Sequence, residues 1–408
     1  MYIGIYINQS FISAAYIDPY EGVKFFSNEF NFNGHPTHLA PLDAVIDGEY
    51  AYLGNQVIFL EINNPEIMVY RDFFNDILYS EAPLLNNQDI SHWESQDLLS
   101  LFLRKIKTDF EHQFDLNIQG VILSSSLPSS PETMIKLQKA FDQVNLNLIG
   151  HIEIEKSILM GYGILSNIEK SSYNLLINLD PKELTLSVFQ KNQNDDIIVL
   201  NRNVIKRLGG NRIYKKFSEL LIENYQKLTN QQIKETPKES ILFKTKIKTL
   251  LGSFLNEHLP YYTVLLGFQS SIVEMIITRK HITEILFSYM SELNELISQE
   301  LSEVDTTIHN IKNILISGTS YNVYFINEYL KHKLDDDVQL VFNLPDQIAV
   351  KGSAIIANDN KQRLHCKSIT ENCFNTSKLL NNSTLEDKHF KSKSEKISKM
   401  NINISENI

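Results

Sequence analysis

The chain has 408 residues, of which 43% are hydrophobic and 21% charged, and its formal net charge is −11. This acidic balance argues against nucleic acid and anionic membrane as partners. No apolar run approaches the roughly 20 residues that span a bilayer. The first seven residues have no basic region of the kind that opens a signal peptide, so we expect a cytoplasmic protein. The length exceeds what one compact core accommodates and predicts two lobes.

Two β-branched, apolar runs near the N-terminus, residues 2–7 and 11–17, predict a hairpin, and residues 22–28 predict a third strand. The same outline recurs over residues 174–202, where the turn of the hairpin is 180–183. That turn carries two acids and a proline. Because the same strand pattern stands near the start of each half, it predicts a duplicated lobe.

Helices and single strands are predicted after each of these two patterns. Apolar residues at helical spacing begin at Trp93, and Ser130 before Pro131 fits an N-cap followed by proline at the first helical position. The remaining predictions are helices at 212–229, 238–256 and 281–302, strands at 121–125, 261–267, 270–278 and 338–342, a strand–glycine turn–helix at 313–334, and a small-residue helix within 344–358.

After Asn360 the composition changes to Lys, Ser and Asn with little periodicity, which predicts a disordered polar tail over 361–408 with no specific role. His365, Cys366 and Cys373 lie in this tail. Their spacing matches no zinc-binding pattern, so we predict no metal site there.

Three turns typical of phosphate or nucleoside binding follow one another: the N-terminal hairpin, the hairpin near Asn178, and a strand–Gly–Thr–Ser–helix sequence near Gly318. In this order they resemble the actin-like ATPase fold. Within that fold the chain resembles the nucleotide-binding domain of the seventy-kilodalton heat-shock chaperone family (the DnaK type). The resemblance extends over residues 2–358, and its closest stretches are IITRKHITEIL at 276–286 and PDQIAVKGSAIIA at 345–357.

The resemblance implies an α/β fold with two lobes, each holding a duplicated mixed β-sheet flanked by helices, plus smaller inserted subdomains. It places lobe I at 1–170 with an insertion at about 36–92, and lobe II at 171–360 with an insertion at about 212–280. It also implies ATP or ADP with Mg²⁺ as cofactor. The residues that would contact the nucleotide are Ser10, Gly209, Gly210, Gly318, Thr319 and Asp346.

Several positions depart from the family pattern. Tyr6, Asn178 and Ile154 fall where the family has catalytic carboxylates, so no catalytic residue is assigned, and Arg71 lies near the position of its catalytic lysine. Tyr6 and Asn178 cannot supply the charge that holds hydrated Mg²⁺.

The second turn departs most. Pro181 offers no N–H donor. A carboxylate about 4 Å from a phosphate costs roughly 4 kcal/mol at an effective dielectric of about 20, and Asp180 and Glu183 each bring one. Tight binding of ATP·Mg²⁺ is therefore not expected, and efficient hydrolysis still less. A shifted register, in which Asp180 replaces a lost carboxylate, stays open.

Three functions follow from this reading. The first is a divergent nucleotide-binding domain with weak or lost ATP hydrolysis, acting as a binding or scaffold module for a protein partner. The second is a chaperone-like protein that binds ATP through altered phosphate and magnesium ligands, and if the chain is an enzyme we expect an ATPase. The third is a sugar or acetate kinase of the same superfold, against which the matches at 276–286 and 345–357 argue.

Overall fold

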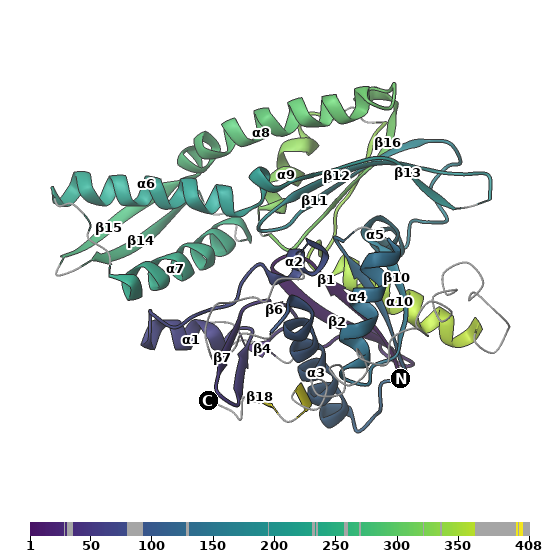
Figure 1. Ribbon diagram of the computed structural model, residues 1–408. Coiled ribbons are helices and arrows are strands. Elements are labelled where there is room, and N and C mark those ends of the chain that lie inside the picture. Colours follow the sequence, from purple (N-terminus) through teal and green to yellow (C-terminus); the bar gives the residue numbers. More distant parts are fainter. Residues whose placement is uncertain are drawn as a thin grey trace. The chain divides into compact units, whose positions relative to one another are not determined.

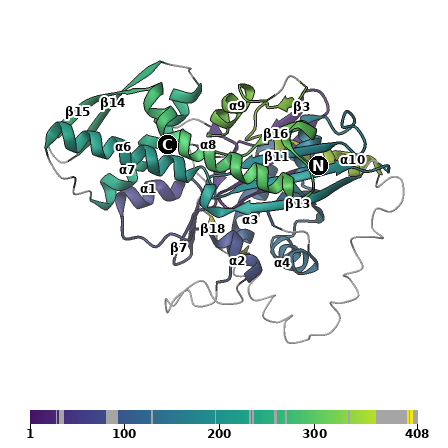
Figure 2. The same cartoon turned by 90° about the horizontal axis from the view of Figure 1, so that it is seen from above.

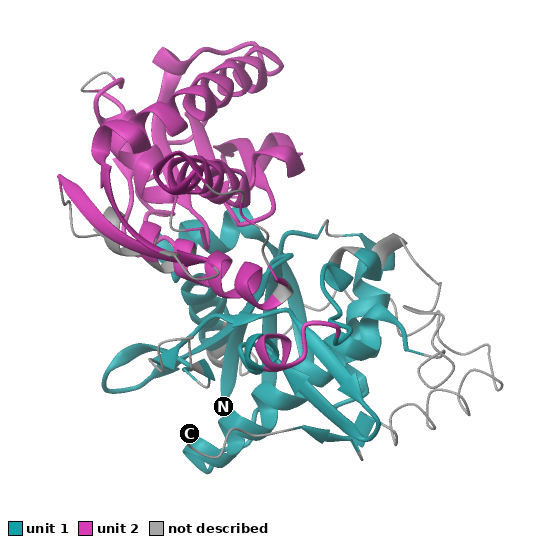
Figure 3. Ribbon diagram, turned by 90° about the vertical axis from the view of Figure 1, so that its left-hand side faces the viewer, with its two compact units in different colours: residues 1–59, 67–163, 347–408 teal, residues 60–66, 164–346 magenta. Residues whose placement is uncertain are grey.

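The computed structural model is that of an α/β protein with several mixed sheets flanked by helices. It describes residues 1–27, 29–30, 36–79, 93–127, 130–194, 196–230, 233, 236–256, 260–268, 271–320, 322–334, 337–363, 397–398 and 400–402. The chain divides into two compact units, coloured separately in Figure 3. Unit 1 comprises residues 1–59, 67–163 and 347–408, and unit 2 comprises residues 60–66 and 164–346.

The central sheet of unit 1 has the order β10-β9-β1-β2-β3, with β6 also pairing with β2. Strands β1 and β2 form the predicted N-terminal hairpin, and β3 continues it in the antiparallel direction. Strands β9 and β10 add to the other side of β1, both in parallel. The strands span Tyr2–Ile7 (β1), Phe11–Asp18 (β2), Gly22–Phe25 (β3), Gly120–Ser125 (β9) and Leu148–Glu153 (β10).

Unit 2 holds a second sheet with the order β13-β12-β11-β16-β17. Its first three strands are antiparallel neighbours, and β16 and β17 add in parallel beside β11. Order and directions are those of the first sheet, so the repeated strand pattern does correspond to a repeated topology. The strands span Tyr173–Leu179 (β11), Leu184–Lys191 (β12), Ile197–Ile205 (β13), Ile311–Ser317 (β16) and Gln339–Val341 (β17).

Helices occupy equivalent positions in the two repeats, before and after the two parallel strands. The first set is Ser95–Phe114 (α3), Pro131–Asp142 (α4) and Ile154–Tyr162 (α5), and the second is Arg279–Ser302 (α8), Val323–Lys331 (α9) and Ile348–Arg363 (α10). Ser130 caps α4 as predicted, because its side chain accepts a hydrogen bond from the Thr133 N–H. Each repeat therefore consists of three strands, an insertion, and then the alternating helix and strand order αβαβα.

The insertions differ between the repeats. In unit 2 the insertion is a pair of helices against a two-stranded antiparallel sheet, which Figures 1 and 2 both draw side by side. These elements are Asn211–Thr229 (α6), Pro237–Asn256 (α7), Tyr261–Phe268 (β14) and Ser271–Thr278 (β15). The first insertion contains Glu29–Phe30 (β4), Pro36–Thr37 (β5), Ala40–Pro41 (β6), Ala44–Asp47 (β7), Tyr50–Leu53 (β8), Gln56–Asn63 (α1) and Phe73–Tyr79 (α2).

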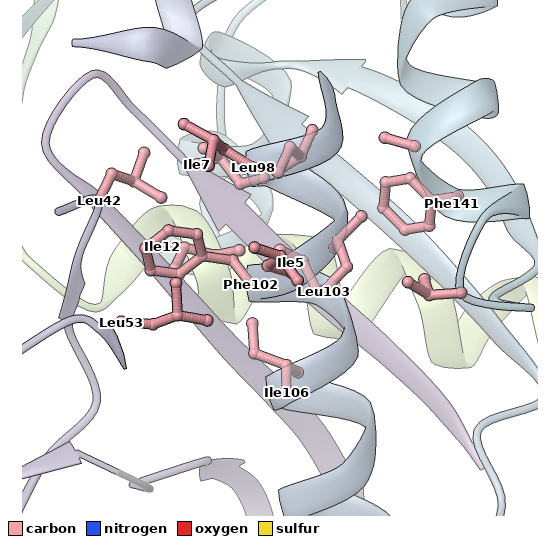
Figure 4. Packing of buried hydrophobic residues seen from close by; sticks show 14 of the residues in the cluster. Ile5, Ile7, Ile12, Leu42, Leu53, Leu98, Phe102, Leu103, Ile106 and Phe141 are labelled. Atoms are coloured by element: carbon pink, nitrogen blue, oxygen red, sulfur yellow. The ribbon is translucent and has the colours of Figure 1, made fainter. Parts of the chain in front are cut away.

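Each unit has its own apolar core. In unit 1 the inward side chains of β1 and β2 pack against the apolar stripe of α3, as the sticks of Figure 4 show for Ile5, Ile12 and Phe102. In unit 2 the core joins β11, β12 and β16 to α6, α8 and the β14–β15 sheet. Burial of this apolar area is the main favourable term in folding each unit.

Helix α10 belongs to unit 1 by its contacts, whereas the family resemblance implied that residues up to 360 lie in the second lobe. The reason is close packing against α5. A Cβ added to Gly352 would lie 1.7 Å from the Ser157 carbonyl oxygen, and one added to Gly161 would lie 2.1 Å from the Ile348 carbonyl oxygen. Ser157 Oγ and Ser353 Oγ also lie 3.0 Å apart, within hydrogen-bond distance, across this contact.

The C-terminal residues depart from the expectation of a disordered tail in two places. Helix α10 continues to Arg363. Asn401–Ile402 form a short strand (β18) that pairs in parallel with β8, and Ile397 and Met400 are buried in the core of unit 1. Composition alone missed this contact because Ile397, Met400 and Ile402 are isolated apolar residues in a polar stretch. The rest of the predicted tail, including His365, Cys366 and Cys373, lies outside the described residues.

In the described part of the chain, no helix is both long and apolar enough to cross a membrane.

Glu300 joins α8 to β13 and is the basis of a pH-dependent prediction. Its two carboxylate oxygens accept hydrogen bonds from Asn201 Nδ2 (2.7 Å) and Asn203 Nδ2 (2.5 Å). Burial raises the pKa of Glu300; the hydrogen bond from Asn203 acts in the opposite direction, and the nearby charge of Glu303 adds to the rise. A raised pKa in the folded state stabilises the protein below the unfolded pKa of about 4.3, and this contribution is lost as the pH rises.

We therefore expect Glu300→Gln to gain stability relative to the wild type as the pH rises from about 4 to 7, because the amide does not ionise. Urea unfolding at several pH values measures this difference. Glu295→Gln, an exposed position on the same helix, is the matched control for the removal of one negative charge from α8. A pH-independent difference for Glu300→Gln would contradict the prediction.

Candidate functional site

The turn 180–183 lies between β11 and β12 and is closed by a hydrogen bond from the Asp180 N–H to the Glu183 carbonyl (2.9 Å). Both acidic side chains are turned inward, since Asp180 and Glu183 are each only 1% exposed. A turn that binds phosphate offers free backbone N–H groups to solvent. This turn instead buries two carboxyl groups.

The Asp180 carboxylate is bound by groups of unit 2 itself. Its Oδ1 accepts hydrogen bonds from the Thr319 backbone N–H (3.0 Å) and the Thr319 hydroxyl (2.8 Å), and its Oδ2 accepts one from Asn178 Nδ2 (2.9 Å). The Asp180 side chain therefore links the hairpin turn to Thr319, in the segment that precedes α9.

Gly209 and Gly210 lead into α6 and pack directly on the same turn. The Gly210 N–H donates to the Asp180 carbonyl (2.9 Å), and the Asn211 N–H donates to the Pro181 carbonyl (2.7 Å). A Cβ added to Gly209 would lie 2.2 Å from the Lys182 carbonyl carbon. The glycines thus permit a close approach of two backbone segments, and these two N–H donors at the helix start are used by the turn.

The Gly318 turn closes the other side of this arrangement. Gly318 has φ +128°, a conformation that favours glycine, and a Cβ there would lie 2.0 Å from the Leu179 carbonyl oxygen. The Gly318 N–H donates to the Pro345 carbonyl (3.2 Å), and the Ser320 N–H donates to the Leu179 carbonyl (3.1 Å). Asp346 follows Pro345 and is half-buried.

Unit 2 accordingly brings together four residues that the sequence predicted for one site: Gly209, Gly210, Gly318 and Thr319. Asp346 is next in sequence to a residue that contacts this set. We refer to residues 178–183, 209–211, 318–320 and 322 as the turn cluster. The backbone N–H groups at positions 210, 211, 318, 319 and 320 all donate to partners within unit 2.

Asn322 is a member of the turn cluster that the sequence did not indicate. It is fully buried, and its Nδ2 donates to the Gly210 carbonyl (3.0 Å) and to Ser320 Oγ (3.2 Å). Within the described residues, Asn322 Oδ1 and Asn178 Oδ1 are buried acceptors without a hydrogen-bond partner. The only sequence signal for Asn322 was its position two residues beyond Ser320, just before a helix.

The N-terminal hairpin of unit 1 closes its turn in a different way. Pairing of Ile7 with Ile12 in β1–β2 matches that of Leu179 with Leu184 in β11–β12, so Asn8 occupies the position equivalent to Asp180. Asn8 Oδ1 accepts hydrogen bonds from the N–H groups of Ser10 and Phe11, both at 2.8 Å. These two donors of the first turn are therefore also satisfied locally.

The other predicted positions of unit 1 are apolar, buried or paired elsewhere. Tyr6 and Ile154 are buried, and neither is a carboxylate. Arg71 forms an ion pair with Asp43, with its Nε 3.3 Å from Asp43 Oδ2. Ser10 is half-buried, and its Oγ has no hydrogen-bond partner in the part of unit 1 that the structure describes.

The described residues contain no group of three or more His, Cys, Asp or Glu side chains that could hold a metal ion. No protein-family model matches the chain. Evidence on function therefore comes from the turn cluster and from the repeated topology.

Proposed function

We propose that this chain is a divergent nucleotide-binding domain of the seventy-kilodalton heat-shock chaperone type, with the actin-like ATPase fold and with weak or lost ATP hydrolysis. In this proposal it acts as a binding or scaffold module for a protein partner. Two observations support the fold. The two central sheets share one strand order and one set of directions, and each continues as αβαβα after an insertion.

The observation that carries the functional proposal is how the turn cluster uses its donors. A phosphate would need the N–H groups of residues 210, 211 and 319, and these already donate to Asp180 and Pro181. Opening the cluster would break hydrogen bonds to a buried carboxylate, each worth about 1.5–3 kcal/mol. It would also place the carboxylate of Asp180 near the charge of the phosphates.

The proposal predicts that 1 mM ATP with Mg²⁺ changes the melting temperature of the protein by no more than about 1 °C. For comparison, a ligand at a hundredfold excess over its dissociation constant stabilises by about 2.7 kcal/mol, which corresponds to several degrees for a unit of this size. Differential scanning fluorimetry with ATP, ADP and Mg²⁺ measures the shift, and phosphate release measures hydrolysis. A shift of several degrees that requires Mg²⁺ would contradict the proposal.

Asp180→Ala belongs in the same measurement because it removes one negative charge and releases the donors of Thr319. A shift in this variant with none in the wild type would identify the Asp180 carboxylate as the group that excludes nucleotide. No shift in either protein is expected, because the N–H groups of residues 210 and 211 still bond to the backbone of the turn.

One observation favours the second candidate, a protein that binds ATP through altered ligands. Asn178 Oδ1 and Asn322 Oδ1 are buried acceptors in the turn cluster whose hydrogen-bonding capacity is unused within unit 2 as described. Buried polar atoms normally have a partner, so a bound water, ion or ligand would satisfy them. Isothermal titration of ATP with and without Mg²⁺ separates the two candidates, since only the second predicts micromolar binding.

A further inference from the structure

The edge of the β7–β8 sheet is covered by a segment from the far C-terminus. The order of this sheet is β18-β8-β7, so β8 would be an edge strand without β18. Asn401 and Ile402 lie beside Tyr50 and Ala51, and the Asn401 N–H donates to the Glu49 carbonyl (3.0 Å). An edge strand with open backbone groups is a template on which another extended segment can add.

Side chains fix the same segment. Ile397 and Met400 are 2% and 5% exposed and belong to the unit 1 core, and Ile402 packs partly against it. Burying an aliphatic side chain of this size contributes about 1.5–3 kcal/mol. Three apolar residues spaced over six positions therefore anchor a segment whose neighbours are polar.

Arg104 on α3 forms hydrogen bonds with the backbone of the segment. Its Nη1 donates to the Ile397 carbonyl and to the Met400 carbonyl, the latter at 2.6 Å. Among the residues described, no carboxylate pairs with Arg104, and burial lowers the pKa of its guanidinium. Arg104 is thus a partly buried cation that donates hydrogen bonds to two carbonyl groups of one short segment, which favours a specific contact with that segment.

We propose that β8, Arg104 and the adjoining part of the unit 1 core form a docking surface for an extended peptide with apolar residues at positions 1, 4 and 6, and that Ile397 and Met400–Ile402 of the same chain occupy it as its ligand. Main-chain pairing along β8 and burial of the apolar anchors supply the affinity, and Arg104 donates hydrogen bonds to two carbonyl groups of the peptide. This inference does not depend on nucleotide binding or on the proposed function.

The docking surface is tested in the full-length protein by releasing its own ligand. Ile397→Asp/Met400→Asp places two charges where the apolar anchors lie and should free this surface. We expect a fluorescent peptide of residues 394–404 to bind this variant saturably, with a dissociation constant on the order of micromolar. Binding to the wild type should be at least tenfold weaker, because a ligand in the same chain competes at an effective concentration on the order of millimolar.

Matched controls lie on the same helix. Adding Arg104→Ala to the double variant should weaken peptide binding at least tenfold. Adding Lys107→Ala should not, although Lys107 also donates to backbone carbonyls, those of Val144 and Asn145. A peptide that carries both Asp substitutions should not bind either protein.

Two outcomes would overturn the proposal. One is a folded double variant, judged by hydrogen exchange of α3, that binds no peptide. The other is loss of the folded core in the double variant, which would make residues 397–402 part of the core and not a ligand. Wild-type protein cut by a site-specific protease within 364–396 gives an independent readout: the C-terminal fragment should dissociate on dilution while α3 stays protected from exchange.

Discussion

Replacing Asp180 with alanine is expected to destabilise unit 2 by about 3 kcal/mol. The carboxylate accepts hydrogen bonds from Thr319 N–H, Thr319 Oγ1 and Asn178 Nδ2, and it is 1% exposed. Its removal takes an acceptor away from these buried donors, and the loss of one such hydrogen bond costs about 1–3 kcal/mol. Hydrogen exchange of the peptides that cover β11, β12 and β16 measures the loss within unit 2.

The equivalent position in unit 1 provides the matched control. Asn8→Ala removes the acceptor for the N–H groups of Ser10 and Phe11, but these contacts stay within one turn. Its cost should be close to about 1 kcal/mol, the usual net contribution of a neutral hydrogen bond. Similar costs for the two variants would mean that the contact from Asp180 to Thr319 adds little.

A double-mutant cycle isolates that contact. Thr319→Val removes the hydroxyl and keeps the backbone N–H, so alone it should cost about 1 kcal/mol. The double variant Asp180→Ala/Thr319→Val should lose less stability than the sum of the two single losses, because both substitutions remove the same hydrogen bond. Additive costs would show that Asp180 and Thr319 act independently.

The secondary structure was predictable because its signals are local. Period-2 runs marked β1, β2, β11 and β12, and Ser130 with Pro131 marked the start of α4. The repeat itself was visible because both hairpins share the same spacing. The common strand order of the two sheets required the structure, since β9 and β16 join their sheets through pairings distant in sequence.

Only part of the chemistry of the turn cluster could be predicted from the sequence. Pro181 and the two acids distinguished the turn 180–183 from a glycine-rich phosphate turn, but the partner of Asp180 lies 139 residues away in sequence. No local pattern predicts such a contact. The docking of residues 397–402 was missed for a related reason, because three apolar residues in a polar stretch carry no periodicity.

Replacing Lys105 with alanine is expected to destabilise unit 1 by about 3–5 kcal/mol, the usual cost of breaking a buried ion pair on one side. Lys105 is 4% exposed, with its Nζ 2.8 Å from Asp109 Oδ2 and 3.1 Å from Glu29 Oε1. Burial lowers the pKa of Lys105, but the charges and hydrogen bonds of Glu29 and Asp109 outweigh it, and the net pKa is raised. Its stabilising contribution is therefore lost only in alkali, as the pH rises through this raised pKa.

The cost of Lys105→Ala comes from the two carboxylates that it leaves behind in the core of unit 1, because breaking a buried ion pair on one side strands the partner charge. Glu29 also accepts a hydrogen bond from the Asn55 N–H (3.0 Å), so the loss should reach the segment between β8 and α1. Urea unfolding at neutral pH measures the loss. Lys136→Ala is the control: its partner Glu132 is 70% exposed, and such surface pairs contribute about 0–1 kcal/mol. Equal costs for the two variants would show that the Lys105 cluster behaves as a surface pair.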